Sequence, residues 1–480
     1  MRLVLVNPSF QTRVRRIAQT SVGPPLGLAY LAAAVRAKGF EVRVVDANVF
    51  GLSEARAAAA AFDLQPDVVG ITAATPTIAR AGEIAGHLKA LDPGITTIVG
   101  GPHATALPAR TLAEFPAVDI VARGEAEGSL PALLAALDRG ASRRALTDVP
   151  GFVLREEGGS VVDTGAAARL DCLDRLPLPA RDLLPMRRYR TVDSDRFTTM
   201  LAMRGCPCSC VYCYVPELFG RRMRYRSPAA VVAEMDEVHA RHGVTLVSFV
   251  DDTFTTRREW VEEFSDHAQT SGVARRVRWT CLTRADMVDR ALLAAMRRAG
   301  CLRIEFGIES ASAAGVAFLD KGQSEEKVLA AFRDARAVGL STMGFLILNI
   351  PGETEADIVS SFELARRADP DFLQVSFLTP YPGTALRAEA ERRGWITTDD
   401  WSRYLFLRDI VLDHGGLPPA KLERIYSQQM RRFYLRPRTA IKFGRLVLGG
   451  RSELRPLMRT VMLGLAGLLA GQSEGDRREP

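Results

Sequence analysis

The segment Arg204-Gly205-Cys206-Pro207-Cys208-Ser209-Cys210-Val211-Tyr212-Cys213 contains four of the seven cysteines in this chain of 480 residues. Cys206, Cys210 and Cys213 have the spacing CxxxCxxC, and soft thiolates on one short loop suit iron–sulfur clusters and zinc. Three such ligands can hold three irons of a [4Fe–4S] cube and leave the fourth iron open, whereas a structural zinc site normally needs a fourth Cys or His. Cys208 could supply that ligand to zinc, but it lies outside the spacing and we interpret it as a non-ligand.

The cysteine segment follows the first of six β-like runs that are separated by helical patterns. These runs are residues 198–203, 246–250, 277–280, 303–306, 342–348 and 372–378. Alternating strands and helices predict a parallel sheet, and six βα units predict a partial (β/α)6 barrel over residues 196–390. In such a barrel the functional site lies at the carboxyl ends of the strands, which is where the cysteine segment falls.

The first 140 residues show another α/β pattern, upstream of the barrel. Short β-rich runs at residues 3–6, 41–45, 68–72, 96–99 and 119–121 alternate with Ala-rich helical stretches. Five strands at this spacing predict a flavodoxin-like (Rossmann-type) doubly wound domain over residues 1–140, with its ligand at the carboxyl ends of the strands. Those ends carry Asp46, Thr72, Gly100, Gly101, His103, Gly124 and Glu125.

The remaining segments predict a linker and a helical tail. Three prolines between residues 176 and 185 disfavour continuous helix, so we expect residues 141–195 to connect the two α/β domains. Residues 391–480 have helical patterns, and ten Lys or Arg residues against one acid, Glu453, lie between residues 424 and 459. This basic region is either a solvated helical face or a surface for anionic lipid, an acidic partner or an anionic substrate.

Composition narrows the class of protein. An apolar fraction of 47% and a charged fraction of 25% allow large cores and argue against global disorder. Cysteines clustered in a long chain indicate metal or redox chemistry in a reducing compartment rather than a disulfide framework. The start has no signal-peptide pattern, and the apolar run at residues 461–470 is far short of the ~20 residues of a spanning helix. We therefore expect a cytoplasmic protein with, at most, peripheral membrane contact through its C-terminal region.

The cysteine segment and the strand ends of the barrel resemble the radical S-adenosylmethionine superfamily over residues 198–386. The resemblance implies that S-adenosylmethionine binds the open iron of a [4Fe–4S] cluster through its amino and carboxylate groups. It also implies that the reduced cluster cleaves the sulfonium to give a 5′-deoxyadenosyl radical, which abstracts hydrogen from a substrate. A barrel suits this chemistry because it shields a radical from water and oxygen.

The same resemblance implies contacts between strand-end residues and S-adenosylmethionine. The expected contacts are Tyr212, Asp251, Asp252, Arg284, Glu309 and Asn349. Tyr212 matches the position that contacts adenine, although it could equally be a core aromatic residue. The two aspartates could hold the methionyl ammonium or, together with Thr253, cap the next helix. Arg284 could pair with the methionyl carboxylate.

Residues 1–390 as a whole resemble the cobalamin-binding class of radical S-adenosylmethionine enzymes. The N-terminal motifs that carry this resemblance are Pro24-Pro25-Leu26-Gly27-Leu28, Gly100-Gly101-Pro102-His103-Ala104-Thr105 and Arg123-Gly124-Glu125. The resemblance implies that cobalamin binds to the first domain through the strand-end residues given above, together with Asn48. For His103 it implies a contact to the cofactor tail or to a cofactor ligand, and a loop histidine with its own hydrogen bonds is the alternative.

One departure from many cobalamin-binding modules concerns the lower ligand of cobalt. Those modules have a loop Asp-x-His-x-x-Gly whose histidine ligates the metal, whereas this chain has Asp46-Ala47-Asn48-Val49-Phe50-Gly51. Because asparagine replaces histidine, we expect no imidazole ligand from position 48. Weak lower ligation would ease reduction to cobalt(I).

The two halves together predict a cobalamin-dependent radical methyltransferase acting on an unactivated carbon or phosphorus through the 5′-deoxyadenosyl radical and methylcobalamin. An oxidative cyclase or rearrangement enzyme with the same cofactors is the alternative, and a non-catalytic cobalamin or iron–sulfur sensor is a third hypothesis. The expected partners are a small-molecule substrate, lipid-like or a natural-product intermediate, and an electron donor such as flavodoxin or ferredoxin. No nucleic-acid motif accompanies the net charge of +7, so we expect no nucleic-acid partner.

Overall fold

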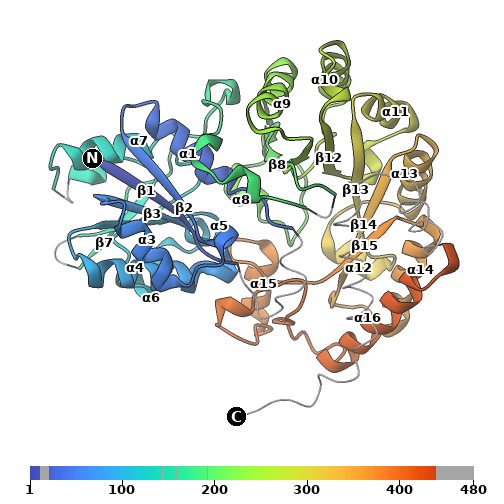
Figure 1. The fold of residues 1–480 in the computed structure, drawn as a ribbon. Coiled ribbons are helices and arrows are strands. Elements are labelled where there is room, and N and C mark those ends of the chain that lie inside the picture. The colour runs from blue at the N-terminus through green and yellow to red at the C-terminus, as the bar shows by residue number, and fades with distance from the viewer. Residues whose placement is uncertain (11–20, 143–144, 157–158, 192, 439–480) are drawn as a thin grey trace.

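The computed structural model describes residues 1–480 except 11–20, 143–144, 157–158, 192 and 439–480. Figure 1 shows two α/β halves beside each other, the N-terminal half mainly in blue and the barrel in green to orange. Strands and helices alternate along both halves, so the α/β class predicted from the sequence pattern is confirmed.

The N-terminal half is built on a seven-stranded sheet in the order β2-β1-β3-β4-β5-β6-β7. Its first five strands are parallel: β1 (Arg2–Asn7), β2 (Glu41–Asp46), β3 (Val68–Thr72), β4 (Thr96–Gly100) and β5 (Ile120–Ala122). Strands β1, β3 and β4 are mostly buried, as expected for central strands with helices on both faces. The strand order reverses at β1, and ligands of doubly wound folds bind at such a switch point.

The first sheet extends past residue 140, where the sequence predicts a linker. β6 (Phe152–Arg155) pairs antiparallel with β5, and β7 (Val161–Asp163) pairs antiparallel with β6. Sequence periodicity misses this hairpin because both strands are short and an antiparallel pair needs no crossover helix. The predicted boundary is therefore corrected: the connection between the halves begins after β7 and contains short 3₁₀ turns.

Helices cover both faces of the first sheet. On one face, α1 (Leu26–Arg36) and α7 (Leu130–Asp138) share an apolar cluster, and on the other α3 (Glu54–Phe62) and α4 (Ile78–Leu91) share a second one. Three shorter helices, α2 (Ala47–Phe50), α5 (Pro102–Ala106) and α6 (Pro108–Glu114), follow β2 and β4. The carboxyl ends of these strands therefore lead directly into short helices, as a ligand-binding edge requires.

The second half is an open barrel of parallel strands in the order β15-β14-β13-β12-β11-β8. Their bounds are β8 (Phe197–Met200), β11 (Leu246–Phe249), β12 (Arg278–Thr283), β13 (Cys301–Glu309), β14 (Ser341–Leu348) and β15 (Phe372–Phe377). The barrel helices are α8 (Val215–Phe219), α9 (Pro228–His242), α10 (Arg258–Thr270), α11 (Arg290–Arg298), α12 (Ala313–Leu319), α13 (Glu325–Ala337), α14 (Glu355–Ala368) and α15 (Ala385–Arg393). The predicted partial (β/α)6 barrel is confirmed.

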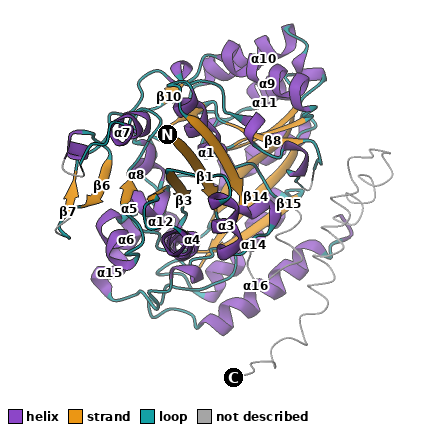
Figure 2. Ribbon diagram, turned by 60° about the vertical axis from the view of Figure 1, so that its left-hand side comes forward, coloured by secondary structure: helices purple, strands orange, loops and turns teal. Residues whose placement is uncertain are grey.

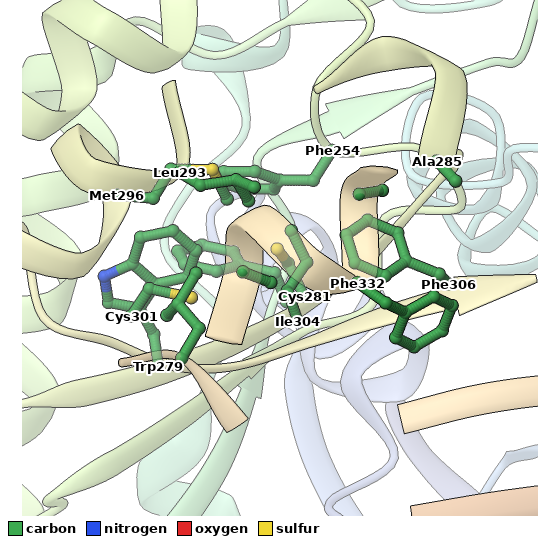
Figure 3. Close-up of a cluster of buried hydrophobic side chains, with 14 of the residues drawn as sticks. Phe254, Trp279, Cys281, Ala285, Leu293, Met296, Cys301, Ile304, Phe306 and Phe332 are labelled. Carbon is green, nitrogen blue, oxygen red and sulfur yellow. The ribbon is translucent and has the colours of Figure 1, made fainter. Parts of the chain in front are cut away.

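An apolar core rich in aromatic rings lies between the barrel strands and the outer helices. Figure 3 shows Phe254, Trp279 and Phe306 in this core together with Cys281 and Cys301. Both cysteines are buried among apolar side chains, and small buried thiols behave there as hydrophobic residues. They belong to the core and not to the cysteine segment.

The C-terminal part of the described chain returns to the N-terminal half before it reaches its last helix. Trp401 packs into the apolar cluster that α3 and α4 share. The last helix, α16 (Pro419–Tyr434), lies outside the barrel against α14, where Arg366 donates a hydrogen bond to Gln429 (3.0 Å; Figures 1 and 2). Within the described part of the chain, no helix is long and apolar enough to cross a membrane. The apolar run 461–470 and the end of the basic region lie outside the described residues.

Candidate functional site

The cysteine segment begins in a short two-stranded sheet beyond β8. β9 (Met203–Arg204) pairs antiparallel with β10 (Arg224–Tyr225), and the chain then turns at Gly205. Gly205 has a φ of +99°, and a Cβ there would collide with the carbonyl oxygen of Arg222. Only glycine fits this turn, which delivers the three cysteines to the carboxyl end of the barrel.

Asp251 fixes the base of the cysteine segment. This residue follows β11, is fully buried, and accepts hydrogen bonds from the backbone N–H groups of Ala202 (3.0 Å) and Met203 (2.6 Å). Burial raises the pKa of its carboxyl to about 7, and the two backbone N–H groups oppose that rise. Because the Asp251 side chain binds the backbone before the cysteines, it positions the cysteine segment from below.

A cavity of about 310 Å³ opens at the carboxyl ends of the barrel strands. Cys206, Cys210 and Cys213 line it, and so does Cys208. The residues predicted to contact S-adenosylmethionine that also line it are Tyr212, Asp252, Arg284 and Glu309. Six strand ends thus bring together side chains that are far apart in the sequence, as a parallel barrel does.

Three of the charged side chains in this cavity, Lys321, Glu309 and Arg284, form ion pairs. Lys321 donates a hydrogen bond to Glu309 (2.7 Å), and the hydroxyl of Tyr212 donates to the same carboxylate oxygen (3.2 Å). Arg284 forms an ion pair with Asp286 (2.7 Å). Cations and anions within one partly buried cavity suit a zwitterionic ligand, because each charge of the ligand meets an opposite charge.

The thiols differ in how readily they ionise. A hydrogen bond from Cys208 lowers the pKa of Cys206 to about 6, despite the opposing effect of burial. Burial raises the pKa of Cys210, and burial raises that of Cys213 to about 12. Within the Cys206–Cys208 pair this hydrogen bond favours the thiolate at Cys206, and a thiolate is the form that ligates metal.

The donor set of the loop fits an iron–sulfur cluster. Cys206, Cys210 and Cys213 line one cavity together with Cys208, and Arg284 and Glu309 line the same cavity. Among the residues that the structure describes, no three His, Cys, Asp or Glu side chains converge closely enough to hold a single metal ion. Cys206, Cys210 and Cys213 are the residues that would hold the cluster.

Asn349 is not among the described residues that line the cavity. Its backbone has a φ of +66°, its amide nitrogen donates to the carbonyl of Leu412 (2.8 Å), and its amide oxygen lies 3.1 Å from Nε2 of His414. These bonds tie the end of β14 to the C-terminal segment. Contact between this side chain and S-adenosylmethionine, expected from the motif, stays a prediction.

The residues predicted to bind cobalamin lie along the carboxyl edge of the first sheet. Asp46 ends β2, is buried, and accepts hydrogen bonds from Tyr189 (2.7 Å) and Asn7 (2.8 Å). Burial raises the pKa of its carboxyl, and these hydrogen bonds oppose the rise. Asn48 lies in α2, and its side-chain oxygen accepts from the backbone of Phe10 (2.8 Å). Both side chains therefore have protein partners in this structure.

The loop after β4 packs closely on the end of β3. Gly101 has a φ of +102°, and a Cβ there would lie 2.8 Å from the carbonyl oxygen of Ala73 and 3.1 Å from the hydroxyl of Thr72. At the end of β5, Gly124 has a φ of +68° and donates its backbone N–H to Thr105 (3.0 Å). Gly100, which ends β4, lies beside them in the sheet. These glycines let three strand ends approach at the ligand-binding edge.

His103 keeps one ring nitrogen without a hydrogen-bond partner among the described residues. Nδ1 lies 3.3 Å from the hydroxyl of Thr75, whereas Nε2 is buried and unpaired. The ring packs edge-on against Trp401, with 4.8 Å between centroids. A buried polar atom without a partner is costly, so this nitrogen at the strand edge fits a polar group of a bound cofactor.

Glu125 joins the two halves. Its carboxylate accepts hydrogen bonds from Arg204 (2.8 Å) and Arg224 (2.9 Å), and all three side chains are buried. Nearby, the hydroxyl of Tyr214 donates to the carbonyl of Pro102 (2.6 Å), so α8 after the cysteine segment meets α5 of the first half. Figure 1 shows α5 and α8 between the halves. The ligand-binding edge of the first sheet therefore abuts the cysteine segment.

Comparison with known proteins agrees with this geometry. The family model of the B12 binding domain matches residues 13–134, and that of the Radical SAM superfamily matches residues 200–365. A curated relative, an uncharacterised methyltransferase of Pyrococcus horikoshii, is 32% identical and the match covers 92% of this chain and 94% of the relative. The chain belongs to the cobalamin-binding radical S-adenosylmethionine enzymes.

Another curated relative and two solved structures are also similar to this radical S-adenosylmethionine enzyme. The anaerobic magnesium-protoporphyrin IX monomethyl ester cyclase of Rubrivivax gelatinosus is 29% identical over 91% of this chain and 78% of its own. The solved methyltransferase TsrM of Kitasatospora setae, with cobalamin and a [4Fe–4S] cluster bound, has a TM-score of 0.71 at 18% identity, covering 91% of this chain and 89% of that one. OxsB, solved with aqua-cobalamin and S-adenosylmethionine, has a TM-score of 0.69 at 16% identity, covering 98% and 79%. These structures confirm the fold of the radical S-adenosylmethionine enzyme described here.

The cofactors of this radical S-adenosylmethionine enzyme are a [4Fe–4S] cluster, S-adenosylmethionine and cobalamin, as its two matched domains indicate. Sequence patterns do not single out several residues of its cavity. Lys321 follows α12 rather than a strand, and Gln374, Phe345 and Phe406 belong to no motif. Period-two alternation along β14 and β15 is the signal that could have placed Phe345 and Gln374 on the inner face.

Proposed function

We propose that this enzyme transfers a methyl group to an unactivated carbon, or to phosphorus, of a small-molecule substrate. The observation that carries the proposal is the contact between the ligand-binding edge of the first sheet and the cysteine segment, through Tyr214 and Pro102 and through Glu125 and Arg204. A substrate in the barrel cavity would lie beside both cofactor sites. The Pyrococcus horikoshii relative, which matches the chain over 92% of its length, is named a methyltransferase and supports this reaction.

The cavity residues have distinct proposed tasks. When bound, the cluster supplies the electron that cleaves S-adenosylmethionine, and cobalamin supplies the cobalt that carries the methyl group. Cys206, Cys210 and Cys213 hold the cluster. Arg284 is available to pair with the methionyl carboxylate, and Glu309 with the methionyl ammonium or the ribose, because both line the cavity. The walls of the barrel exclude water from a reactive radical.

At the edge of the first sheet, His103 is the residue best placed for a polar contact to cobalamin. Its Nε2 is buried and has no partner in the described structure. We propose that Thr72, Gly100, Gly101 and Gly124 shape the surface on which the cofactor lies. Asn48 already accepts a backbone hydrogen bond, so we propose that it does not ligate cobalt.

Oxidative cyclisation is the second candidate, because a cyclase from Rubrivivax gelatinosus is 29% identical over 91% of this chain. The deciding experiment is anaerobic reconstitution of the full chain with iron, sulfide, hydroxocobalamin and methyl-labelled S-adenosylmethionine. We expect a bound cluster, bound cobalamin and 5′-deoxyadenosine after reduction. The candidate substrates are those that the functions of neighbouring genes suggest, and we expect the label in the product of one of them. Substrate-dependent 5′-deoxyadenosine with an unlabelled, cyclised product would favour the cyclase. A lack of 5′-deoxyadenosine would revive the sensor hypothesis.

The partners of the enzyme follow from the same chemistry. We propose a one-electron donor such as flavodoxin or ferredoxin, acting in the cytoplasm, since the cluster must be reduced before it acts. Peripheral membrane contact through residues 440–480 is a proposal from sequence alone. Co-sedimentation with anionic liposomes, with and without residues 440–480, tests it, and equal sedimentation of both chains would contradict it.

A further inference from the structure

The charged residues of the barrel cavity gather on one side. Asp252 follows β11, Arg284 follows β12, and Glu309 ends β13. Lys321 joins them through its ion pair with Glu309 (2.7 Å). The cysteine segment lies on this side as well, because it follows β8 at the same edge of the barrel. The charges are therefore concentrated where the proposed function places the cluster and the methionyl group.

The part of the cavity wall made by β14 and β15 has no charged lining residue among those described. Phe345 and Ile347 of β14 and Leu378 after β15 give it an apolar surface. Phe406 adds to this surface at the mouth, where it is 40% exposed, and its neighbour Leu407 is 51% exposed. An apolar surface thus runs from the interior of the cavity to solvent.

Most polar groups on this wall already donate their hydrogen bonds to the backbone. The hydroxyl of Ser376 donates to Leu346 (3.2 Å), and that of Thr379 donates to Phe377 (3.0 Å). The Tyr381 hydroxyl likewise donates to the backbone carbonyl of Tyr404 (2.9 Å). These hydroxyls retain no free proton to offer to a ligand.

Gln374 differs from these residues. Along β15 the residues Leu373 and Val375 are buried in the core behind the strand, so Gln374 and Ser376 point to the inner face. Gln374 lines the cavity, and the structure gives its amide no hydrogen bond to any other described residue. A primary amide offers two donors and one acceptor, so it can bind a carbonyl, hydroxyl or amide of a ligand.

We propose that the β14–β15 wall binds an uncharged, largely apolar substrate, and that the Gln374 amide orients it by a hydrogen bond to a neutral polar group. A charged group against this wall would lose its hydration without gaining a counter-charge, which is unfavourable. The exposed side chains of Phe406 and Leu407 continue this apolar surface towards solvent, where it can contact a long apolar substrate. This inference rests on the proposed function, because it assigns the substrate class of that same cavity.

Three probes of equal size test the wall. They are 2-naphthamide, which is neutral, 2-naphthoate, which is an anion, and 2-naphthylmethylamine, which is a cation at neutral pH. Equilibrium dialysis against the anaerobically reconstituted full chain, with cluster, cobalamin and S-adenosylmethionine, gives the dissociation constant of each probe. We expect 2-naphthamide to bind at least about tenfold more tightly than either charged probe, which corresponds to the loss of one well-made polar interaction.

Substitutions at Gln374 and Phe406 then locate the probe. Gln374→Leu should weaken 2-naphthamide about five- to tenfold. Gln374→Glu should reverse the order, so that the cation binds more tightly than the neutral probe. Phe406→Ala, in the exposed loop, should weaken the naphthyl probes by a few fold. The matched control is Gln269→Glu on α10, which adds the same charge outside the cavity and should leave the order unchanged.

Preferential binding of 2-naphthoate, an unchanged order in Gln374→Glu, or no binding by any probe would each overturn the proposal. Formation of 5′-deoxyadenosine is measured on the same preparations. If the wild-type protein forms no 5′-deoxyadenosine, the radical function is contradicted. The order of probe affinities tests only the β14–β15 wall. The two failures are therefore distinguishable.

Discussion

Arg204 lies two residues before Cys206, the first cysteine of the cysteine segment (the cluster loop below). It donates a hydrogen bond of 2.8 Å to Glu125 at the carboxyl edge of the first sheet. Both side chains are buried, with 4% and 2% exposure. Glu125 also pairs with Arg224, and Arg204 also pairs with Glu127. The cluster loop is thus fixed to the cobalamin-binding domain by a buried ionic network.

Replacing Glu125 by alanine should destabilise the chain strongly. The change leaves two buried guanidinium groups without their shared carboxylate, and breaking a buried pair in this way costs about 3–5 kcal/mol. Chemical unfolding followed by circular dichroism measures the loss. Asp163→Ala is the matched control, because it removes an exposed pair with Arg123 and should cost at most about 1 kcal/mol. Similar losses for both variants would contradict a structural role of the buried network.

Cys210→Ala should abolish cluster binding and the cleavage of S-adenosylmethionine, because two thiolates leave the cube without its third protein ligand. Cobalamin binding should largely persist. Cys208→Ala should keep the cluster, although the hydrogen bond that lowers the pKa of Cys206 is lost. Iron and sulfide content together with 5′-deoxyadenosine formation provide the measurement. Loss of the cluster from Cys208→Ala would show that the ligand set is wrong.

His103 should make stability depend on pH in the acid range. Burial, with smaller effects of Arg110 and Arg387, lowers the pKa of this histidine from 6.5 to about 4. The folded state therefore keeps the ring neutral where the unfolded chain takes up a proton, so the contribution is present above pH 6.5 and is lost as the pH falls towards 4. The free-energy difference between wild type and His103→Gln should shrink over that window. A difference that is constant with pH would refute this.

Trp401→Ala should loosen the C-terminal segment from the N-terminal half. The indole donates to Glu114 (2.8 Å), packs on His103, and lies under the guanidinium of Arg110 (4.6 Å). Removing a buried tryptophan costs about 3–5 kcal/mol. Limited proteolysis between residues 395 and 412 reports the loosening. The control Leu435→Ala, at a position 58% exposed, should change neither stability nor cleavage there.

Much of the site could be predicted because the cluster ligands are local in sequence. Cys206, Cys210 and Cys213 lie within eight residues, so their spacing and the family resemblance predict the chemistry before any fold is known. The positions of Arg284 and Glu309 could be predicted as well, because the alternation of strands and helices places both residues at the carboxyl ends of barrel strands, which lie at one edge. Both line the cavity with the thiols.

The sequence alone could not distinguish the roles of adjacent residues. The sequence treats Asp251 and Asp252 alike, but successive residues after a strand point in different directions. Asp252 lines the cavity, whereas Asp251 turns beneath the loop to bind the backbone of Ala202 and Met203. In the same way Glu125, expected as a cobalamin contact, lies in ion pairs with Arg204 and Arg224. Both outcomes depend on partners that are distant in the chain.

By itself, the sequence predicted the cluster ligands and the two α/β halves, because spacing and periodicity are local properties of the chain, and its family resemblance predicted the class of chemistry. Tertiary structure alone decided which charges share the cavity, that Lys321 pairs with Glu309, and that Gln374 faces an uncharged wall. It also decided that the ligand-binding edge of the first sheet meets the cluster loop. The reason is physical: these contacts form only when packing of the two hydrophobic cores brings distant strand ends together and buries their charges in pairs.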